Sequence, residues 1–157
     1  MPEPTIATRR TGAGRVIVAL YALFTVAAGS RAAVQIATRF HEAPLAYALS
    51  AFSAVVYALA TVVMARSGRT SYRIAVVACS VELAGVLAVG TASVVDPAAF
   101  PDATVWSGYG MGYLFVPLVL PVAGLLWLRH VRRGSHGVSP AAAARSGPGR
   151  GRAGRRE

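Results

Sequence analysis

An acidic side chain inside an apolar stretch is the residue with the clearest chemical potential in this sequence. Glu82 lies about eight residues into the stretch 74–95, or ~12 Å from its start if the stretch is helical. An ionised carboxylate in hydrocarbon is costly, so such residues are usually protonated, paired or in contact with water. Glu82 is therefore a candidate proton or cation site for coupled transport. Because no second acid or histidine lies at similar depth, we favour the alternative, an interhelical hydrogen bond or ion pair that fixes packing.

Two residues are candidate partners for Glu82. Arg31 lies about fifteen residues into the first apolar stretch, ~22 Å from its start, so two extended side chains could meet across the bundle. The Arg31 side chain can instead extend to the outer interface, where Asp96 and Asp102 compete for it, and we favour this outer position. Tyr57 lies near the depth of Glu82 and could donate a hydrogen bond to it.

Small residues share one helical face with Glu82: Ala75, Ala78, Cys79 and Gly85. Small side chains let helix backbones approach closely, so this face predicts a contact with another helix, within the chain or across a dimer. Cys79 is the single cysteine of the chain, which excludes an intrachain disulfide. We expect it to be a packing residue.

No motif for catalysis, metal binding or a cofactor stands out. Gly108, Gly110 and Gly112 alternate, but no strand precedes them and no lysine follows, so they do not predict a phosphate-binding loop. The histidines lie outside the apolar stretches, which gives no support to a haem or metal site between helices. We therefore expect no enzyme activity, no cofactor and no metal.

The elements that carry these residues are four apolar stretches in a chain of 157 residues, 55% of them hydrophobic. About 20 apolar residues suffice to cross a ~30 Å hydrocarbon layer as a helix. We expect helices over residues 16–35, 44–65, 74–95 and 105–128, with short loops. This predicts an all-α, polytopic membrane protein, an up-down bundle of four transmembrane helices within residues 16–128.

Prolines and aromatic residues refine these boundaries. Pro44 fits the first turn of the second helix, and Asp96-Pro97 ends the third. Pro117 and Pro121 lie inside the fourth predicted helix and favour a kink there. Aromatic residues suit the membrane interfaces, and we assign Trp106, Tyr109 and Tyr113 to the outer interface and Trp127 to the inner one.

The arginines predict the orientation. All sixteen basic residues are arginines, and fourteen of them flank the predicted bundle on one side, leaving only Arg31 and Arg39 on the other. Because cytoplasmic loops collect arginine, we expect a multi-pass plasma-membrane protein with both termini cytoplasmic. A net charge of +10 would suggest nucleic acid for a soluble protein. Here orientation explains the charge, and we expect no nucleic-acid partner.

The two ends of the chain are polar. Residues 1–15 form a predicted cytoplasmic segment, and the pair Arg9-Arg10 also fits a signal peptide, although no clean cleavage site follows and we expect an uncleaved helix. Residues 129–157, rich in Arg, Gly, Ser and Pro, predict a disordered cytoplasmic tail. Juxtamembrane arginines attract anionic lipids by about 1 kcal/mol each. This makes Arg129, Arg132 and Arg133 candidate lipid contacts, unless the tail only reinforces orientation.

Two segments carry a resemblance: residues 34–62 (VQIATRFHEAPLAYALSAFSAVVYALATV) and residues 96–128 (DPAAFPDATVWSGYGMGYLFVPLVLPVAGLLWL), with Val81-Glu82-Leu83 between them. They resemble small four-helix integral membrane proteins of high-GC actinobacteria, over about residues 9–133. The resemblance implies a polytopic plasma-membrane protein and brings no assigned activity or site residue.

Two functions are compatible with this pattern. The first is a non-enzymatic accessory or scaffold protein of the cell envelope, which uses the small-residue face of the third helix to bind a larger membrane complex. The second is a small proton-coupled transporter that works as a homodimer through Glu82. Small multidrug exporters resemble this outline, but they carry their acid on the first helix, whereas Glu82 is on the third.

Overall fold

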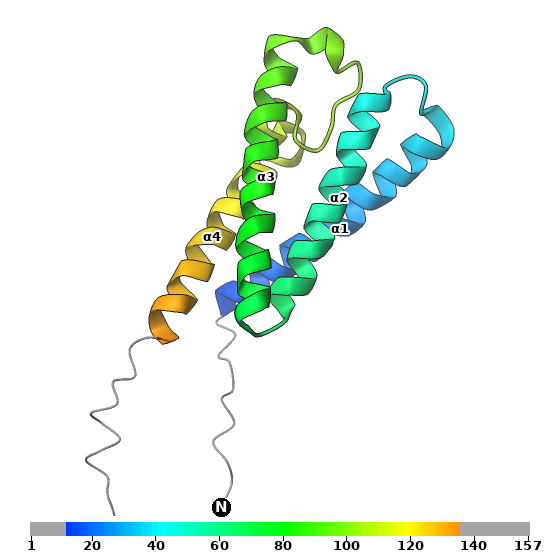
Figure 1. Ribbon diagram of the computed structural model, residues 1–157. Coiled ribbons are helices and arrows are strands. Elements are labelled where there is room, and N and C mark those ends of the chain that lie inside the picture. The colour runs from blue at the N-terminus through cyan, green and yellow to red at the C-terminus, as the bar shows by residue number, and fades with distance from the viewer. Residues whose placement is uncertain (1–11, 136–157) are drawn as a thin grey trace, which may run out of the picture.

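The computed structural model describes residues 12–135, and all regular secondary structure in that range is helical. The elements in chain order are α1 (Gly12–Arg39), α2 (Pro44–Ala65), α3 (Arg69–Val95), the 3-10 helices η1 (Pro97–Ala99) and η2 (Ser107–Tyr113), and α4 (Val116–Ser135) (Figure 1). By length and composition α1, α2 and α3 can each cross a membrane, and η2 with α4 makes a fourth span if the bent pair counts as one. The all-α prediction is confirmed for these residues.

The first three helices follow the apolar pattern but extend beyond it. The bounds of α2 agree with the prediction, and Pro44 occupies its first turn, where a missing N–H costs nothing. The prediction placed the start of the first helix at residue 16 and that of the third at residue 74, whereas α1 begins at Gly12 and α3 at Arg69. Helical backbone hydrogen bonds therefore also form in the polar residues that flank the apolar runs. At the start of α3 the helix is limited by Gly68, whose φ of +134° is not helical.

The fourth predicted helix, residues 105–128, is wrong in nearly its first half, residues 105–115. This segment includes η2, bends by 97° and continues as α4 only from Val116. The backbone lies in the left-handed region at Gly108, Tyr109 and Gly110 within η2, and at Leu114 and Phe115 between η2 and α4. A right-handed helix cannot pass through such a backbone, and glycine is the residue that adopts it at least cost.

The prolines of this segment have different roles from the predicted ones. Pro117 lies in the first turn of α4, where proline is favoured, so it begins the helix and does not kink it. Pro121 lies inside α4, as expected. The apolar part of α4, residues 116–128, measures ~20 Å at 1.5 Å per residue and is shorter than a ~30 Å hydrocarbon layer. A full crossing therefore needs the preceding bent segment as well.

The predicted disordered tail is wrong at its beginning, because α4 runs through Ser135 and so includes Arg129, Arg132 and Arg133. Arginine is a good helix former, and no proline or unusual backbone angle interrupts residues 129–135. The predictions for residues 1–11 and 136–157 lie outside the described residues.

The described arginines separate between the two ends of the molecule. The start of α1, the α2–α3 turn and the carboxyl end of α4 meet at one end, and the α1–α2 turn and the loop after α3 lie at the other (Figure 1). We call the first of these the arginine-rich end; its described arginines are Arg15, Arg66, Arg69, Arg73, Arg129, Arg132 and Arg133. Arg31 and Arg39 lie toward the opposite end.

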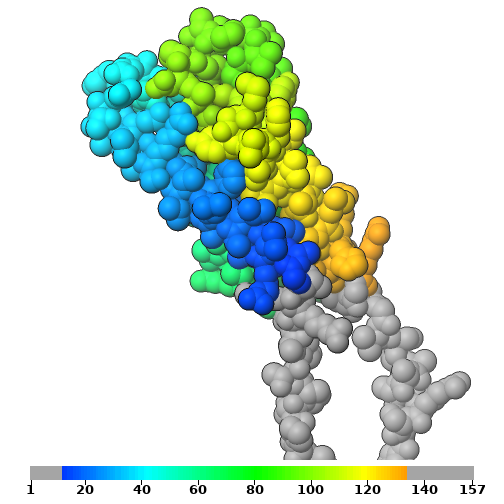
Figure 2. Space-filling view, turned by 180° about the vertical axis from the view of Figure 1, so that it is seen from behind, coloured from blue at the N-terminus to red at the C-terminus, as the bar shows by residue number. Residues whose placement is uncertain are grey.

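Large apolar side chains cover the outer surface of the helices. Val26 on α1, Val55 on α2 and Val94 on α3 are each at least 60% exposed. Figure 2 shows one such face, which α1 crosses with α4 along one side. An apolar exterior is what a bundle with lipid as its solvent requires, because lipid chains impose no cost on exposed valine or leucine. The buried polar side chains of the described residues are Ser50 and Ser53 on α2, Glu82 on α3 and Thr104 in the loop before η2.

Candidate functional site

Glu82 lies at the centre of the bundle interior. Its side chain is fully buried on α3, and the hydroxyl of Tyr21 on α1 donates a hydrogen bond of 2.6 Å to its Oε2. The same hydroxyl lies 3.4 Å from the Sγ of Cys79, one turn earlier on α3. Tyr21 is itself fully buried, so this contact joins α1 to α3 away from any solvent.

The second oxygen of the carboxyl group has no partner. Glu82 Oε1 is buried and makes no hydrogen bond within the described part of the chain. A buried polar atom without a partner costs about 1–3 kcal/mol, and a charged one costs more. A carboxylate would be costly at this position, since no described residue places a cation beside it to offset the desolvation of a charge.

Trp106 closes the outer side of this cluster. Its side chain is 2% exposed, and its indole N–H donates a 3.0 Å hydrogen bond to the hydroxyl of Tyr57 on α2. The six-membered ring lies directly on Gly85, where an added methyl group would come within 2.5 Å of a ring carbon. Trp106 thus ties the segment before η2 to α2 and α3, and its predicted interfacial position is wrong.

The loop around Trp106 is shaped by short-range hydrogen bonds. The hydroxyl of Thr104 accepts from the backbone N–H groups of Trp106 and Ser107, while the Ser107 hydroxyl accepts from the N–H of Thr104. The Ser93 hydroxyl on α3 accepts from the N–H of Gly108. These contacts satisfy backbone donors that a helix would otherwise pair, which lets a non-helical segment enter the bundle.

Aromatic rings connect the cluster to η2. Tyr57 contacts Tyr21 and Phe24, with ring centroids 6.2 and 5.7 Å apart, and Phe24 in turn lies 5.9 Å from Tyr113. Edge-to-face and tilted rings at such distances attract one another beyond simple burial. The buried polar cluster, which we define as Tyr21, Tyr57, Cys79, Glu82 and Trp106, is thereby enclosed on the side of α1 and α2.

Arg31 does not reach Glu82. Its guanidinium donates 3.1 Å to the hydroxyl of Tyr113 and 3.0 Å to the carbonyl oxygen of Ala103, and its Nε–H donates 3.4 Å to the side-chain oxygen of Gln35. Arg31 therefore holds the segment 103–113 onto α1. The direct pair with Glu82, which was the less favoured of the two predicted positions, is absent from the structure of residues 12–135.

The two acids predicted to compete for Arg31 have other partners. The hydroxyl of Tyr47, on α2, donates a short hydrogen bond to Asp102. The Asp96 carboxylate accepts from the N–H of Ala99 and so begins η1. Both contacts fix the loop after α3, as does Arg31, so the polar residues at this end of the molecule order one irregular segment.

The hydrogen-bond donor predicted for Glu82 was Tyr57, but Tyr21 takes that role. The hydrogen bond that the structure gives to Tyr57 comes from Trp106. Nothing in the residue pattern distinguishes Tyr21 from the other tyrosines, since it stands alone in an apolar run. Depth did not single out Tyr21 either, because Tyr57 lies about eight residues from the inner end of its predicted helix, as Glu82 does, whereas Tyr21 lies only about five.

The small-residue face of α3 is used within the chain. Ala75, Ala78 and Cys79 are 1%, 3% and 0% exposed, and Gly85 lies under Trp106. On α4, a methyl group at Gly124 would come within 3.1 Å of the Cys79 sulfur. Among the described residues this face packs within the chain, which is the first of the two contacts that the pattern allowed.

Within residues 12–135 no group of three or more His, Cys, Asp and Glu side chains could hold a metal ion. Comparison with known protein families, curated proteins and solved structures finds no match for this chain. The resemblance to actinobacterial four-helix membrane proteins thus stays a prediction. Inference about function rests on the contacts described above.

Proposed function

We propose that this chain is a multi-pass protein of the plasma membrane that crosses the bilayer four times, up and down, with both termini in the cytoplasm. The lengths of α1, α2 and α3 support three crossings, and η2 with α4 supplies the fourth as a bent span. Seven described arginines lie at the arginine-rich end, which supports a cytoplasmic position for that end.

Within that membrane we propose the role of a non-enzymatic accessory or scaffold protein of the cell envelope. The observation that carries this proposal is the enclosure of Glu82, which is fully buried and hydrogen-bonded to Tyr21. Trp106 and Tyr57 form a second tie between elements beside it. These polar side chains join helices and an inserted loop, and interhelical hydrogen bonds of this kind stabilise membrane bundles.

A partner would meet the outward faces of the bundle. On α2 the exposed apolar residues recur at helical spacing: Leu45, Phe52, Val55, Leu59 and Val62. Between α1 and α4 lies an apolar groove of about 550 Å³, whose walls include Ile17, Leu20 and Val116. Lipid, a second copy of the chain or another membrane protein can cover such surfaces, so a homodimer or a larger complex is part of this proposal.

The alternative is a proton-coupled transporter that works through Glu82. The observation that favours it is the unpartnered Oε1, a buried acceptor that a proton or a moving water could use. In this function the closed cluster would be one state of a cycle, and opening would require Tyr21 to leave the carboxyl group or Trp106 to leave Tyr57 and Gly85.

Glu82→Gln separates the two functions, with Glu42→Gln as a matched control at an exposed position. The chain is reconstituted in liposomes that contain a pH-sensitive dye, and a pH gradient is applied. For the scaffold we expect proton flux at the level of empty liposomes for the wild type and for both variants. Flux that Glu82→Gln abolishes in a folded protein, and that Glu42→Gln preserves, would establish the transporter instead.

The scaffold role has its own readout in native membranes. A photo-crosslinking residue placed at Leu59, which is 44% exposed on α2, should give a discrete protein adduct, and Glu82→Gln should leave that adduct unchanged. An equivalent residue at the buried Ala60 is the control and should give only intrachain products. Adducts with lipid alone at Leu59 and at the equally exposed Val62 would contradict a scaffold role for this face.

A further inference from the structure

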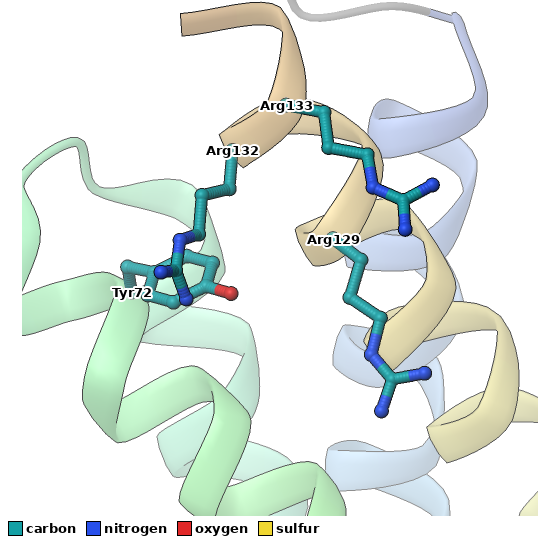
Figure 3. A pocket seen from close by; sticks show the side chains of 4 residues that line it. All are labelled: Tyr72, Arg129, Arg132 and Arg133. Carbon is teal, nitrogen blue, oxygen red and sulfur yellow. The ribbon is translucent and has the colours of Figure 1, made fainter. Parts of the chain in front are cut away.

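A pocket of about 370 Å³ lies between α3 and α4 at the arginine-rich end. Its lining residues are Tyr72 from the first turns of α3 and Arg129, Arg132 and Arg133 from the end of α4. Figure 3 shows the three arginine side chains leaving α4, with Arg132 extending toward Tyr72. The four residues line one pocket, with Arg132 beside Tyr72 and with Arg129 and Arg133 extending to the other side (Figure 3).

The three arginines have no acidic partner in residues 12–135. No salt bridge or hydrogen bond occupies their guanidinium groups there, and the Tyr72 hydroxyl is likewise without a partner in this range. The acids of that range are elsewhere: Glu82 is enclosed in the bundle, and Glu42, Asp96 and Asp102 belong to the opposite end. Three neighbouring positive charges repel one another, so an anion from outside this range would relieve the repulsion.

The donors match the chemistry of a phosphate group. A guanidinium offers N–H donors in a planar fork that fits two phosphate oxygens, and a tyrosine hydroxyl can add a third donor. The position of the pocket along α4 also suits a lipid headgroup, since the apolar part of α4 ends at Leu128 and Arg129 follows directly. In the proposed orientation this places the pocket at the level of the cytoplasmic lipid headgroups.

We propose that Tyr72, Arg129, Arg132 and Arg133 form a binding site for a phosphate group, supplied by an anionic lipid headgroup or by free phosphate. The site goes beyond the scaffold role and does not depend on it. It differs from a diffuse attraction of positive charge to the membrane, because it assigns the binding to residues that line one pocket and not to every arginine at that end.

The test compares two double variants of the full chain in detergent, titrated with phosphatidylglycerol and followed by native mass spectrometry. Arg129→Gln/Arg132→Gln removes two charges from the pocket, and Arg15→Gln/Arg66→Gln removes two exposed charges from the same end. At about 1 kcal/mol for each arginine, we expect the first variant to bind about thirtyfold more weakly. The second should change binding by less than about twofold. Equal weakening in both variants would overturn the pocket.

Two further arms identify the source of the phosphate. Inorganic phosphate that displaces the lipid from the wild type, and binds the pocket variant more weakly, would assign free phosphate as a ligand. Binding of phosphatidylglycerol that inorganic phosphate does not displace would assign the lipid headgroup. Tyr72→Phe, which keeps the ring and so the fold, should weaken either ligand. Wild-type binding of neither ligand, with native helicity by circular dichroism, would overturn the site.

Discussion

Trp106→Ala should destabilise this protein by about 3–5 kcal/mol, the range for truncation of a fully packed aromatic side chain. The ring fills the space over Gly85 and contacts Phe52 edge to face, with centroids 6.0 Å apart. It also makes the only described hydrogen bond to the Tyr57 hydroxyl. The measurement is unfolding by sodium dodecyl sulfate in mixed micelles, together with hydrogen–deuterium exchange over residues 103–115, where exchange should accelerate.

Two control variants separate packing from hydrogen bonding at Trp106. Trp106→Phe keeps most of the ring and loses the N–H donor, so it should cost about 1 kcal/mol from the hydrogen bond, in addition to a smaller packing loss. Phe40→Ala truncates an aromatic residue that is 43% exposed at the same end, and it should cost less than about 1 kcal/mol. If Trp106→Ala is no more costly than Phe40→Ala, the loop does not enter the bundle as described.

Glu82→Lys should be the most damaging change at the buried polar cluster. It places an ammonium group among the neutral side chains of the buried polar cluster, and an uncompensated buried charge costs about 3–5 kcal/mol. Glu82→Gln keeps the volume and an acceptor oxygen for Tyr21, so it should change stability by less than about 1 kcal/mol. Protein level in the membrane and unfolding in mixed micelles report both effects.

The exposed Glu42 provides the reference for this charge reversal. Glu42→Lys makes the same change in charge at a solvated position and should leave stability within about 0.5 kcal/mol of the wild type. The enclosure of Glu82 would be disproved if Glu82→Lys were as stable as Glu82→Gln, because water would then have to reach the side chain.

The apolar pattern was sufficient to predict the first three helices, although α1 and α3 extend beyond it. A long uncharged run forms a helix in lipid, because a helix lets each backbone N–H and C=O group find its hydrogen-bond partner within the same segment. The start of the fourth helix could not be predicted in this way. The segment 103–115 carries no charged residue, so it was joined to the apolar run of α4, and the left-handed backbone of Tyr109, Leu114 and Phe115 is not indicated by their residue types.

The partners in the candidate site depend on tertiary packing that one sequence does not reveal. The acid was recognisable because a lone carboxyl group in an apolar run is rare. Its donor was not, because Tyr21 and Tyr57 are chemically alike and only the rotation of α1 and α2 about their axes decides which one faces Glu82. Arg31 was placed toward the outer end, but its partners, Tyr113 and the Ala103 carbonyl, follow from an irregular fold of the loop.

The proposal that the chain crosses the membrane four times depends most on α4, because its apolar residues 116–128 are too few for a full crossing. Cysteine labelling of the full chain on intact cells, in a Cys79→Ala background with a membrane-impermeant maleimide, tests it directly. We predict that Ala98→Cys is labelled from outside, whereas Ser67→Cys and Ser135→Cys are labelled only after permeabilisation. Labelling of Ser135→Cys on intact cells, with Ser67→Cys still protected, would show that α4 does not cross.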